Sequence, residues 1–167
     1  MKLQLSLLFI VVLMSSPTVA DITEDLKVVG EARLKVFLWK IYDSSLYSES
    51  GFYRGLEPSL TLQINYLRNV NSRQLLNRTQ QEWQKMSIAT DIIDDWLMEL
   101  SAILPDISKG ESLTVQVEDD LSSSFYYNST FLGNVGNPDF TQSFLAIWLS
   151  ENSSYPELQA QLVGMNE

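Results

Sequence analysis

The chain contains neither cysteine nor histidine. Without cysteine no disulfide can form, so packing of the core must hold the fold together by itself. The two absences exclude zinc, haem and copper sites that are built on Cys or His ligands. They also exclude Cys–His and Ser–His nucleophiles and any imidazole general base. The remaining chemistry is that of Arg, Lys, Tyr, carboxylates and hydroxyls, and the sequence predicts no cofactor and no metal site.

Positive charge is also scarce. Eleven Lys and Arg residues stand against 21 Asp and Glu residues, which gives a net charge of −10. Nucleic acids and anionic membrane surfaces both bind concentrated positive charge, so the composition predicts neither as a partner. Hydrophobic residues make up 45% of the chain and aromatic residues 11%. That content is high enough for a packed core, and we do not expect a disordered protein.

Long apolar runs are absent except at the N-terminus. Lys2 precedes an apolar stretch at 3–14, and the small residues at 18–20 suit a signal peptidase. The stretch is shorter than the roughly 20 residues that span a bilayer, so a transmembrane anchor is the weaker interpretation. We expect residues 1–20 to be a cleavable signal peptide. Residues 21–167 would then form one domain in the periplasm, or outside the cell as the alternative, with no stable membrane anchor.

The pattern of apolar residues predicts separate blocks of strands and helices. Period-two alternation predicts strands at 27–36, 37–47, 59–68 and 112–117 and a hairpin at 125–132. Helical spacing and capping residues predict helices that begin at Asn71 or Ser72, Thr90, Asn137 and Pro156. Blocks of strands and of helices are typical of an α+β domain. We therefore expect a mainly antiparallel sheet with a layer of helices on one face.

Four stretches, taken in this order, carry a resemblance to a known family. They are 29–33 leading into FLWKIYDSSLY at 37–47, LTLQINY at 60–66, LPDISKG at 104–110 and DFTQSFLAIWL at 139–149. Together they span nearly all of the expected mature chain. The sequence resembles the chalcone isomerase-like family, and its small exported bacterial branch in particular. This resemblance implies a cleft between the sheet and the helices.

The resemblance also implies what such a cleft holds. Plant enzymes of the family bind a flavonoid there, and non-catalytic relatives bind a fatty acid whose carboxylate meets an arginine and a tyrosine. The family arginine corresponds to Arg33. The catalytic tyrosine falls on or near Val115, the active-site threonine falls near Tyr42, and the assisting lysine and asparagine have no match at 118–120. The resemblance therefore implies a non-catalytic member, and we predict no catalytic residues.

Three residues are candidates for binding a ligand. Arg33 offers a planar fork that suits a carboxylate, although an ion pair with Glu31 or Asp43 is the alternative. Tyr42 follows in the next predicted strand and could donate a phenolic hydrogen bond. Trp39 could face the helices and line the cleft, whereas the other tryptophans lie on helix stripes that predict core packing.

The leading hypothesis is a non-catalytic periplasmic protein that binds a small amphiphile, such as a fatty acid or another apolar carboxylate. The alternative is an interaction or assembly protein of the cell envelope, with large side chains that fill the cleft and no ligand. A third hypothesis is an isomerase acting on a flavonoid-like ketone. It is the weakest of the three, because the catalytic residues have no match and a shared fold alone does not imply a shared function.

Overall fold

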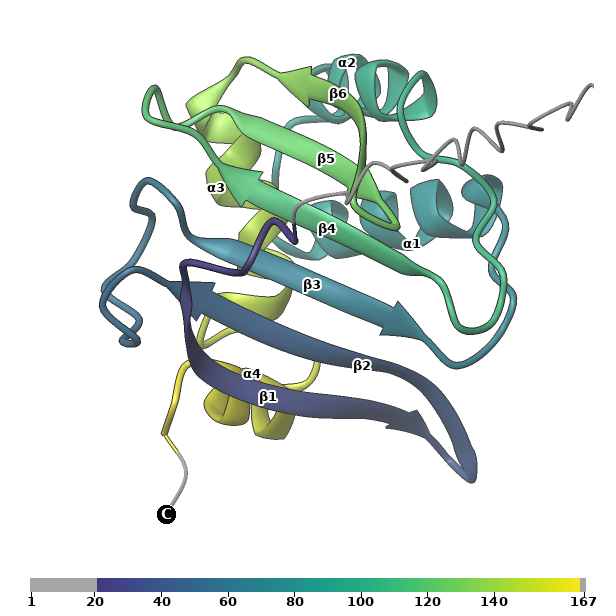
Figure 1. The fold of residues 1–167 in the computed structure, drawn as a ribbon. Coiled ribbons are helices and arrows are strands. Elements are labelled where there is room, and N and C mark those ends of the chain that lie inside the picture. Colours follow the sequence, from purple (N-terminus) through teal and green to yellow (C-terminus); the bar gives the residue numbers. More distant parts are fainter. Residues whose placement is uncertain (1–20, 166–167) are drawn as a thin grey trace, which may run out of the picture.

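The computed structural model describes residues 21–165, and the expected signal peptide at 1–20 lies outside the described residues. One six-stranded antiparallel sheet holds the strands in chain order. They are β1 (Lys27–Val36), β2 (Trp39–Ser48), β3 (Thr61–Tyr66), β4 (Ser112–Val117), β5 (Ser123–Tyr127) and β6 (Thr130–Val135). Behind the sheet in Figure 1 lie α1 (Ser72–Lys85), α2 (Thr90–Ser101), α3 (Pro138–Leu149) and α4 (Pro156–Leu162). The predicted α+β class is confirmed.

Within residues 21–165, no helix has both the length and the apolar character needed to cross a bilayer.

The first hairpin departs from the predicted boundaries. Strand β2 begins at Trp39 and not at 37, because Phe37 and Leu38 form a two-residue turn between Val36 and its partner Trp39. Further along, Lys35 pairs with Lys40 and Leu34 pairs with Tyr42, so Ile41 is an extra residue in the ladder. Such a β-bulge bends the strand locally and redirects its side chains. The bulge explains why strict alternation failed here, and it allows Ile41 and Tyr42 to line the same cavity.

An aromatic cluster fills one half of the space between sheet and helices. Its members come from α1, α2, α3 and β5: Trp83, Trp96, Phe125, Phe140 and Phe144. Most of these rings meet edge to face, with centroids 5.3–6.4 Å apart. The indole N–H of Trp83 donates to the carbonyl oxygen of Ser143 at 3.0 Å, so this fully buried ring keeps its one polar group satisfied. The cluster fixes α1 and α3 against the β5 side of the sheet.

Helix α4 closes the other end of the sheet by packing directly on β1. At Gly30 a Cβ atom would lie 2.1 Å from the carbonyl oxygen of Gln161 and 2.6 Å from that of Leu162. Only glycine permits this approach of helix backbone to strand backbone. The contact brings Tyr155, which precedes α4, to the rim of the space between β1 and α1.

Candidate functional site

The half of the interlayer space that the aromatic cluster leaves open is a cavity of about 360 Å³. Its walls come from β1 to β4, α1 and α3, and they are mainly apolar: Leu34, Val36, Ile41, Ile64, Leu75, Leu113, Val115, Phe144 and Ile147 are among the lining residues. The volume lies at the lower end of the roughly 300–1,000 Å³ that is typical of small-molecule sites. A cavity of this size and character suits a slender apolar ligand.

Helix α1 brings a charged side chain to this cavity. The helix begins with a capping box: the Asn71 side chain accepts from the Gln74 N–H at 2.9 Å, and the Gln74 side chain accepts from the Asn71 N–H at 3.0 Å. One turn beyond Gln74, Arg78 lines the cavity with a side chain that is 46% exposed. Half-exposure of a lining residue marks the place where the cavity reaches solvent. The mouth of the cavity therefore carries a guanidinium group.

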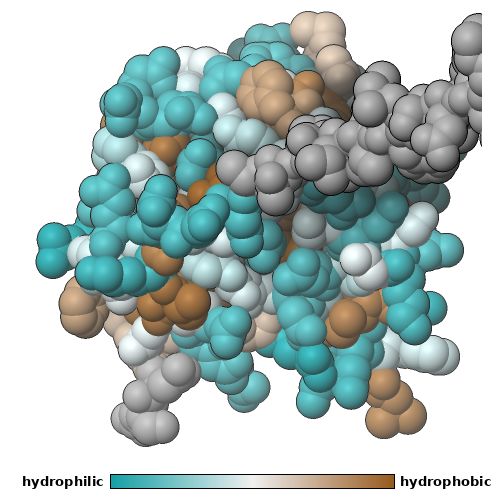
Figure 2. Space-filling view, viewed as in Figure 1, coloured by the Kyte–Doolittle hydropathy of each residue, from teal (hydrophilic) through white to brown (hydrophobic). Residues whose placement is uncertain are grey.

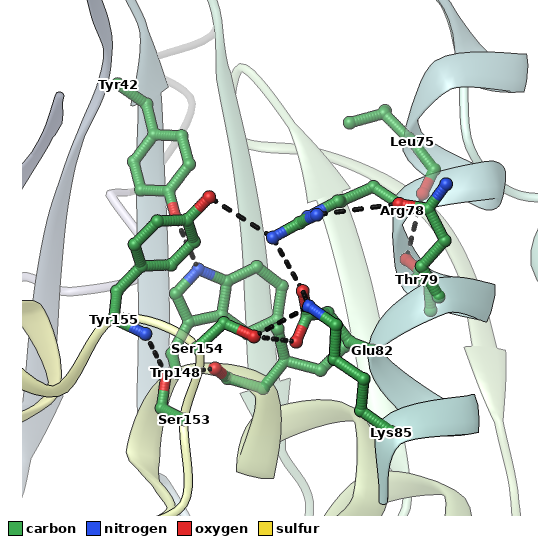
Figure 3. A network of polar contacts seen from close by, with 12 residues as sticks. Tyr42, Leu75, Arg78, Thr79, Glu82, Lys85, Trp148, Ser153, Ser154 and Tyr155 are labelled. Carbon is green, nitrogen blue, oxygen red and sulfur yellow. Dashed lines mark hydrogen bonds and ion pairs between the residues drawn. The ribbon is translucent and has the colours of Figure 1, made fainter. Parts of the chain in front are cut away.

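Glu82 lies one turn further along α1 and is only 3% exposed. Its carboxylate contacts Arg78 at 2.6 Å and Lys85 at 3.1 Å, and it accepts a hydrogen bond from the Ser154 hydroxyl at 2.6 Å (Figure 3). Burial by itself would raise the pKa of Glu82. The hydrogen bonds from Ser154 and Lys85 and the charge of Arg78 outweigh burial, so the pKa lies below its ordinary value. Glu82 is therefore an anion that orients Arg78, and it is a weak base.

Tyr155 completes the mouth opposite α1. Its hydroxyl oxygen accepts from the Arg78 guanidinium at 3.1 Å, and the guanidinium carbon lies 5.7 Å from the ring centroid. Figure 3 shows Arg78 between Tyr155 and Glu82. An arginine carries five N–H donors, and the contacts to these two residues both use the same terminal nitrogen. Within residues 21–165, the other terminal nitrogen reaches only Gln81, at 3.5 Å. Donors of Arg78 thus remain for an anion at the mouth.

Tyr42 lies deeper in the same cavity and is 9% exposed. Its hydroxyl oxygen accepts from the indole N–H of Trp148 at 2.9 Å, and its ring meets that of Tyr66 edge to face at 5.9 Å. Burial raises the pKa of Tyr42 well above its ordinary value, more than the hydrogen bond from Trp148 lowers it. The phenol therefore stays neutral, and it can act as a hydrogen-bond donor but not as a base. The structure thus places the sequence-predicted Tyr42 in the cavity wall.

Arg33 lies on the opposite face of the sheet. Its neighbours Ala32 and Leu34 point inward and are buried, whereas its own side chain is 42% exposed. The guanidinium pairs with Asp43 on β2 through two hydrogen bonds, one of them at 2.7 Å, and this pairing holds the pKa of Asp43 below its usual value. This ion pair is the alternative that the sequence left open. Arg33 contributes to a wide polar groove of about 990 Å³ and not to the apolar cavity.

Trp39 also lies outside the cavity. It occupies the end of the first hairpin, where it is 61% exposed, and the guanidinium carbon of Arg68 lies 4.6 Å from its ring centroid. The structure therefore does not bring the three predicted residues together, since Tyr42 alone of them lines the cavity. Ligand binding by Arg33 and Trp39 stays a prediction, and the cavity itself presents Tyr42 with two residues that the sequence did not single out, Arg78 and Tyr155.

The sequence contained a signal for the ion pair between Arg78 and Glu82. Arg78 and Glu82 stand four apart, and Lys85 follows three later, which is the spacing of ion pairs along one helix face. Glu82 also directly precedes Trp83, at the edge of the apolar stripe. A carboxylate beside a buried stripe with cations one turn away on both sides is a candidate for a buried, paired charge.

The cavity has little chemistry beyond binding. Val115 forms part of its wall and is 1% exposed, and an isopropyl group can neither donate nor accept a proton. The one carboxylate among the lining residues is Glu82, which its cationic neighbours hold ionised. Among residues 21–165, no cluster of three or more potential ligands could hold a metal ion. The arrangement is suited to holding an apolar molecule with an anionic end.

Comparison with known proteins gives the same fold. An Arabidopsis thaliana fatty-acid binding protein superposes with a TM-score of 0.63 at 12% identity, covering 86% of this chain and 92% of that one. An uncharacterised protein of Haemophilus influenzae is 29% identical over 136 residues, which are 81% of this chain and 67% of the relative. The family model described as chalcone isomerase-like matches residues 13–164. The resemblance that the sequence suggested is thereby confirmed, and the chain belongs to the chalcone isomerase-like family.

Proposed function

We propose that this protein is a non-catalytic binding protein for a small amphiphile with a carboxylate, such as a fatty acid. The hydrocarbon chain occupies the cavity between the sheet and the helices, and the carboxylate meets Arg78 and Tyr155 at the mouth. Its place of action is the periplasm, on the basis of the export signal expected at 1–20. The observation that carries the proposal is the single guanidinium at the solvent end of a mainly apolar cavity.

Two physical arguments support a carboxylate over a neutral head group. A guanidinium binds a carboxylate through charge-assisted hydrogen bonds, which are about twice as strong as neutral ones. Tyr155 holds the guanidinium in place from one side and Glu82 from the other, so less side-chain freedom is lost when the ligand arrives. The fatty-acid binding protein from Arabidopsis, which shares the fold, makes a fatty acid the first ligand to try.

The alternative of an envelope assembly protein required large side chains that close the space between sheet and helices. The aromatic cluster fills only one half of that space, and the cavity of about 360 Å³ in the other half favours a ligand over a filled cleft.

The test compares acid and alcohol ligands of the same chain length. Delipidated protein should bind the fatty acid more tightly than the fatty alcohol, measured by displacement of a fluorescent probe. Arg78→Gln should weaken binding of the acid by about 1–2 kcal/mol, or roughly 5- to 30-fold, since the lost bonds are charged but half exposed. It should leave binding of the alcohol nearly unchanged, because the alcohol carries no charge.

Arg33→Gln is the matched control. This arginine is exposed to a similar degree but lies on the other face of the sheet, so its loss should leave both affinities unaltered. Equal binding of acid and alcohol by the wild-type protein would contradict the carboxylate proposal. Loss of acid binding in Arg33→Gln and not in Arg78→Gln would move the site to the outer face.

A further inference from the structure

The turn of the first hairpin carries an apolar tip, defined here as Phe37, Leu38 and Trp39. Phe37 is 95% exposed, Leu38 is 97% exposed and Trp39 is 61% exposed. Figure 2 shows a hydrophobic group projecting at the lower right, where Figure 1 places the turn between β1 and β2. Single exposed apolar residues scattered over a surface are normal in proteins. Three adjacent large apolar residues that project from the surface are not.

The turn itself would be more stable with other residues. Phe37 has a φ of 54°, in the left-handed region that glycine and asparagine adopt readily and bulky residues do not. Leu38 is not among the residues with a positive φ, and two-residue hairpin turns with a positive φ at the first position alone favour glycine there, yet the chain has Phe-Leu. Residues that violate a local structural preference on an exposed turn point to a role outside folding.

The surroundings of the tip are cationic, although the whole chain is acidic. The segment from Ala32 to Tyr42 contains three cations and no acid, and the segment from Tyr66 to Arg73 contains two cations and no acid. The two segments touch, because the N–H of Leu67 donates to the carbonyl oxygen of Ile41 at 2.9 Å and Arg68 stacks on Trp39.

Three acids that contact these segments are each engaged within the fold. Asp43 pairs with Arg33, Asp106 accepts from the N–H of Ser72 at 2.7 Å, and Glu111 accepts from the N–H of Ser108 at 2.6 Å. Lys35 and Lys40 pair with each other across the two strands, close to the tip. Five cations in the two segments still outnumber these three acids, so the net charge of −10 that argued against an anionic partner does not describe this end of the molecule.

We propose that the apolar tip inserts into an anionic phospholipid membrane, with Lys35, Lys40 and Arg68 bound to the lipid head groups. Tryptophan and lysine are residues that favour the boundary between head groups and acyl chains. A protein partner is the less suitable occupant, since a stable interface buries about 800 Å² on each side and a two-residue turn presents far less. Apolar insertion combined with basic head-group contacts is how peripheral proteins bind reversibly to membranes.

Docking in this orientation would place the cavity beside the bilayer. Val36 next to the tip and Ile41 two residues beyond it both line the cavity, and so does Val70 from the neighbouring segment. An amphiphile held in the cavity would then lie close to the membrane. This consequence rests on the proposed function, whereas the docking itself does not.

The test is cosedimentation of the protein, prepared without residues 1–20, with vesicles that contain phosphatidylglycerol. Binding is expected to such vesicles and to be weaker at high salt, with little binding to phosphatidylcholine alone. The tryptophan fluorescence should shift to the blue when Trp39 enters the membrane. The shift is assigned to Trp39 because Trp83 and Trp96 are already buried and Trp148 is half-buried. Replacing Lys35 and Lys40 with glutamine should weaken binding by roughly fivefold per cation.

Phe37→Gly combined with Leu38→Asn removes the tip while giving the turn its preferred residues, so the fold should be as stable as before or more so. This variant should lose vesicle binding by on the order of tenfold or more, because apolar burial drives insertion. The matched control is Phe52→Ser, which removes an aromatic residue that is 67% exposed in the loop after β2 and should change nothing.

Vesicle binding by the Gly-Asn variant equal to that of the wild type would overturn the proposal, as would no binding by the wild type. Self-association that disappears in the Gly-Asn variant, without any vesicle binding, would assign the tip to a protein interface instead. The assay needs no ligand in the cavity, so its failure and a failure of fatty-acid binding can be told apart.

Discussion

Replacing Glu82 with glutamine should weaken the fold and, in the same protein, strengthen the binding of a carboxylate ligand. Glu82 is 3% exposed and shares the Arg78 guanidinium with whatever anion arrives at the mouth of the cavity. In the unliganded protein the carboxylate of Glu82 is stabilised by Arg78. With a ligand present, two carboxylates would lie on one guanidinium, and their repulsion opposes binding.

Both magnitudes follow from the contacts. The cations Arg78 and Lys85 are 46% and 56% exposed, so each ion pair contributes no more than about 1 kcal/mol after screening. The bond from the Ser154 hydroxyl is buried on the Glu82 side, and a glutamine oxygen can still accept it. The free energy of unfolding should therefore fall by about 1–2 kcal/mol. Two carboxylates about 6 Å apart at a mouth half open to water repel by about 1 kcal/mol, so removing one should tighten binding roughly fivefold.

Two assays on the same protein decide this prediction. Urea denaturation gives the change in the free energy of unfolding, and displacement of a fluorescent fatty acid gives the change in affinity. Thr79→Ser serves as a control on the same helix face, since it keeps the hydroxyl that donates to the Leu75 carbonyl and alters no charge. A glutamine variant that is destabilised but binds the acid more weakly would refute the reasoning, because it would show that Glu82 holds Arg78 in its binding position more than it competes for it.

Three further predictions concern pH, packing and catalysis. Because the pKa of Glu82 is lowered in the folded protein, its carboxylate stabilises the fold above the unfolded pKa of about 4.3, and this stabilisation is lost as the pH falls through the folded pKa. Urea denaturation from neutral to acidic pH should therefore show a smaller loss of unfolding free energy in Glu82→Gln than in the wild type. Gly30→Ala should lower the free energy of unfolding by about 1–3 kcal/mol, because its Cβ would meet the backbone of α4, and an unchanged denaturation midpoint would contradict that packing. Purified protein should leave the spontaneous cyclisation of a chalcone at its background rate with a racemic product, since Val115 has no proton to transfer; enrichment of one enantiomer would revive the isomerase hypothesis.

Much of the fold followed from local signals in the sequence. Asn71 was one of two predicted caps for the first helix, and its side chain does bond the N–H of Gln74. Asn137 followed by Pro138 predicted the start of α3, and Gly164, with a φ of 80°, follows the end of α4. These residues act on the backbone next to them, which is why the sequence alone locates their effect.

The first hairpin could not be predicted as well because its turn has no turn residues. Phe37 and Leu38 continue the apolar pattern of the flanking strands, and the bulge at Ile41 shifts that pattern by one residue. Turn prediction depends on Gly, Asn, Asp and Pro, and none of them occurs between Ala32 and Tyr42. The missing signal is the same feature that identifies the apolar tip as a candidate membrane-docking element.

The candidate site was harder to predict because its residues converge from distant segments. Tyr42 was expected and lies in the cavity wall, but Arg78 and Tyr155 are 77 residues apart and meet only in the fold. The family resemblance directed attention to Arg33. Strand alternation around it, with Gly30, Ala32 and Leu34 buried, turns its side chain to the outer face. Sequence spacing can assign a face of one strand or helix, but it cannot show which helix covers that face.

The most direct test of the central claim is a crystal structure with a fatty acid that carries bromine on its terminal carbon. We expect the anomalous signal of bromine among the apolar side chains of the cavity, such as Ile64 and Leu113, and the carboxylate within hydrogen-bond distance of Arg78. A carboxylate bound to Arg33, or a hydrocarbon chain outside the space between the sheet and the helices, would contradict the account.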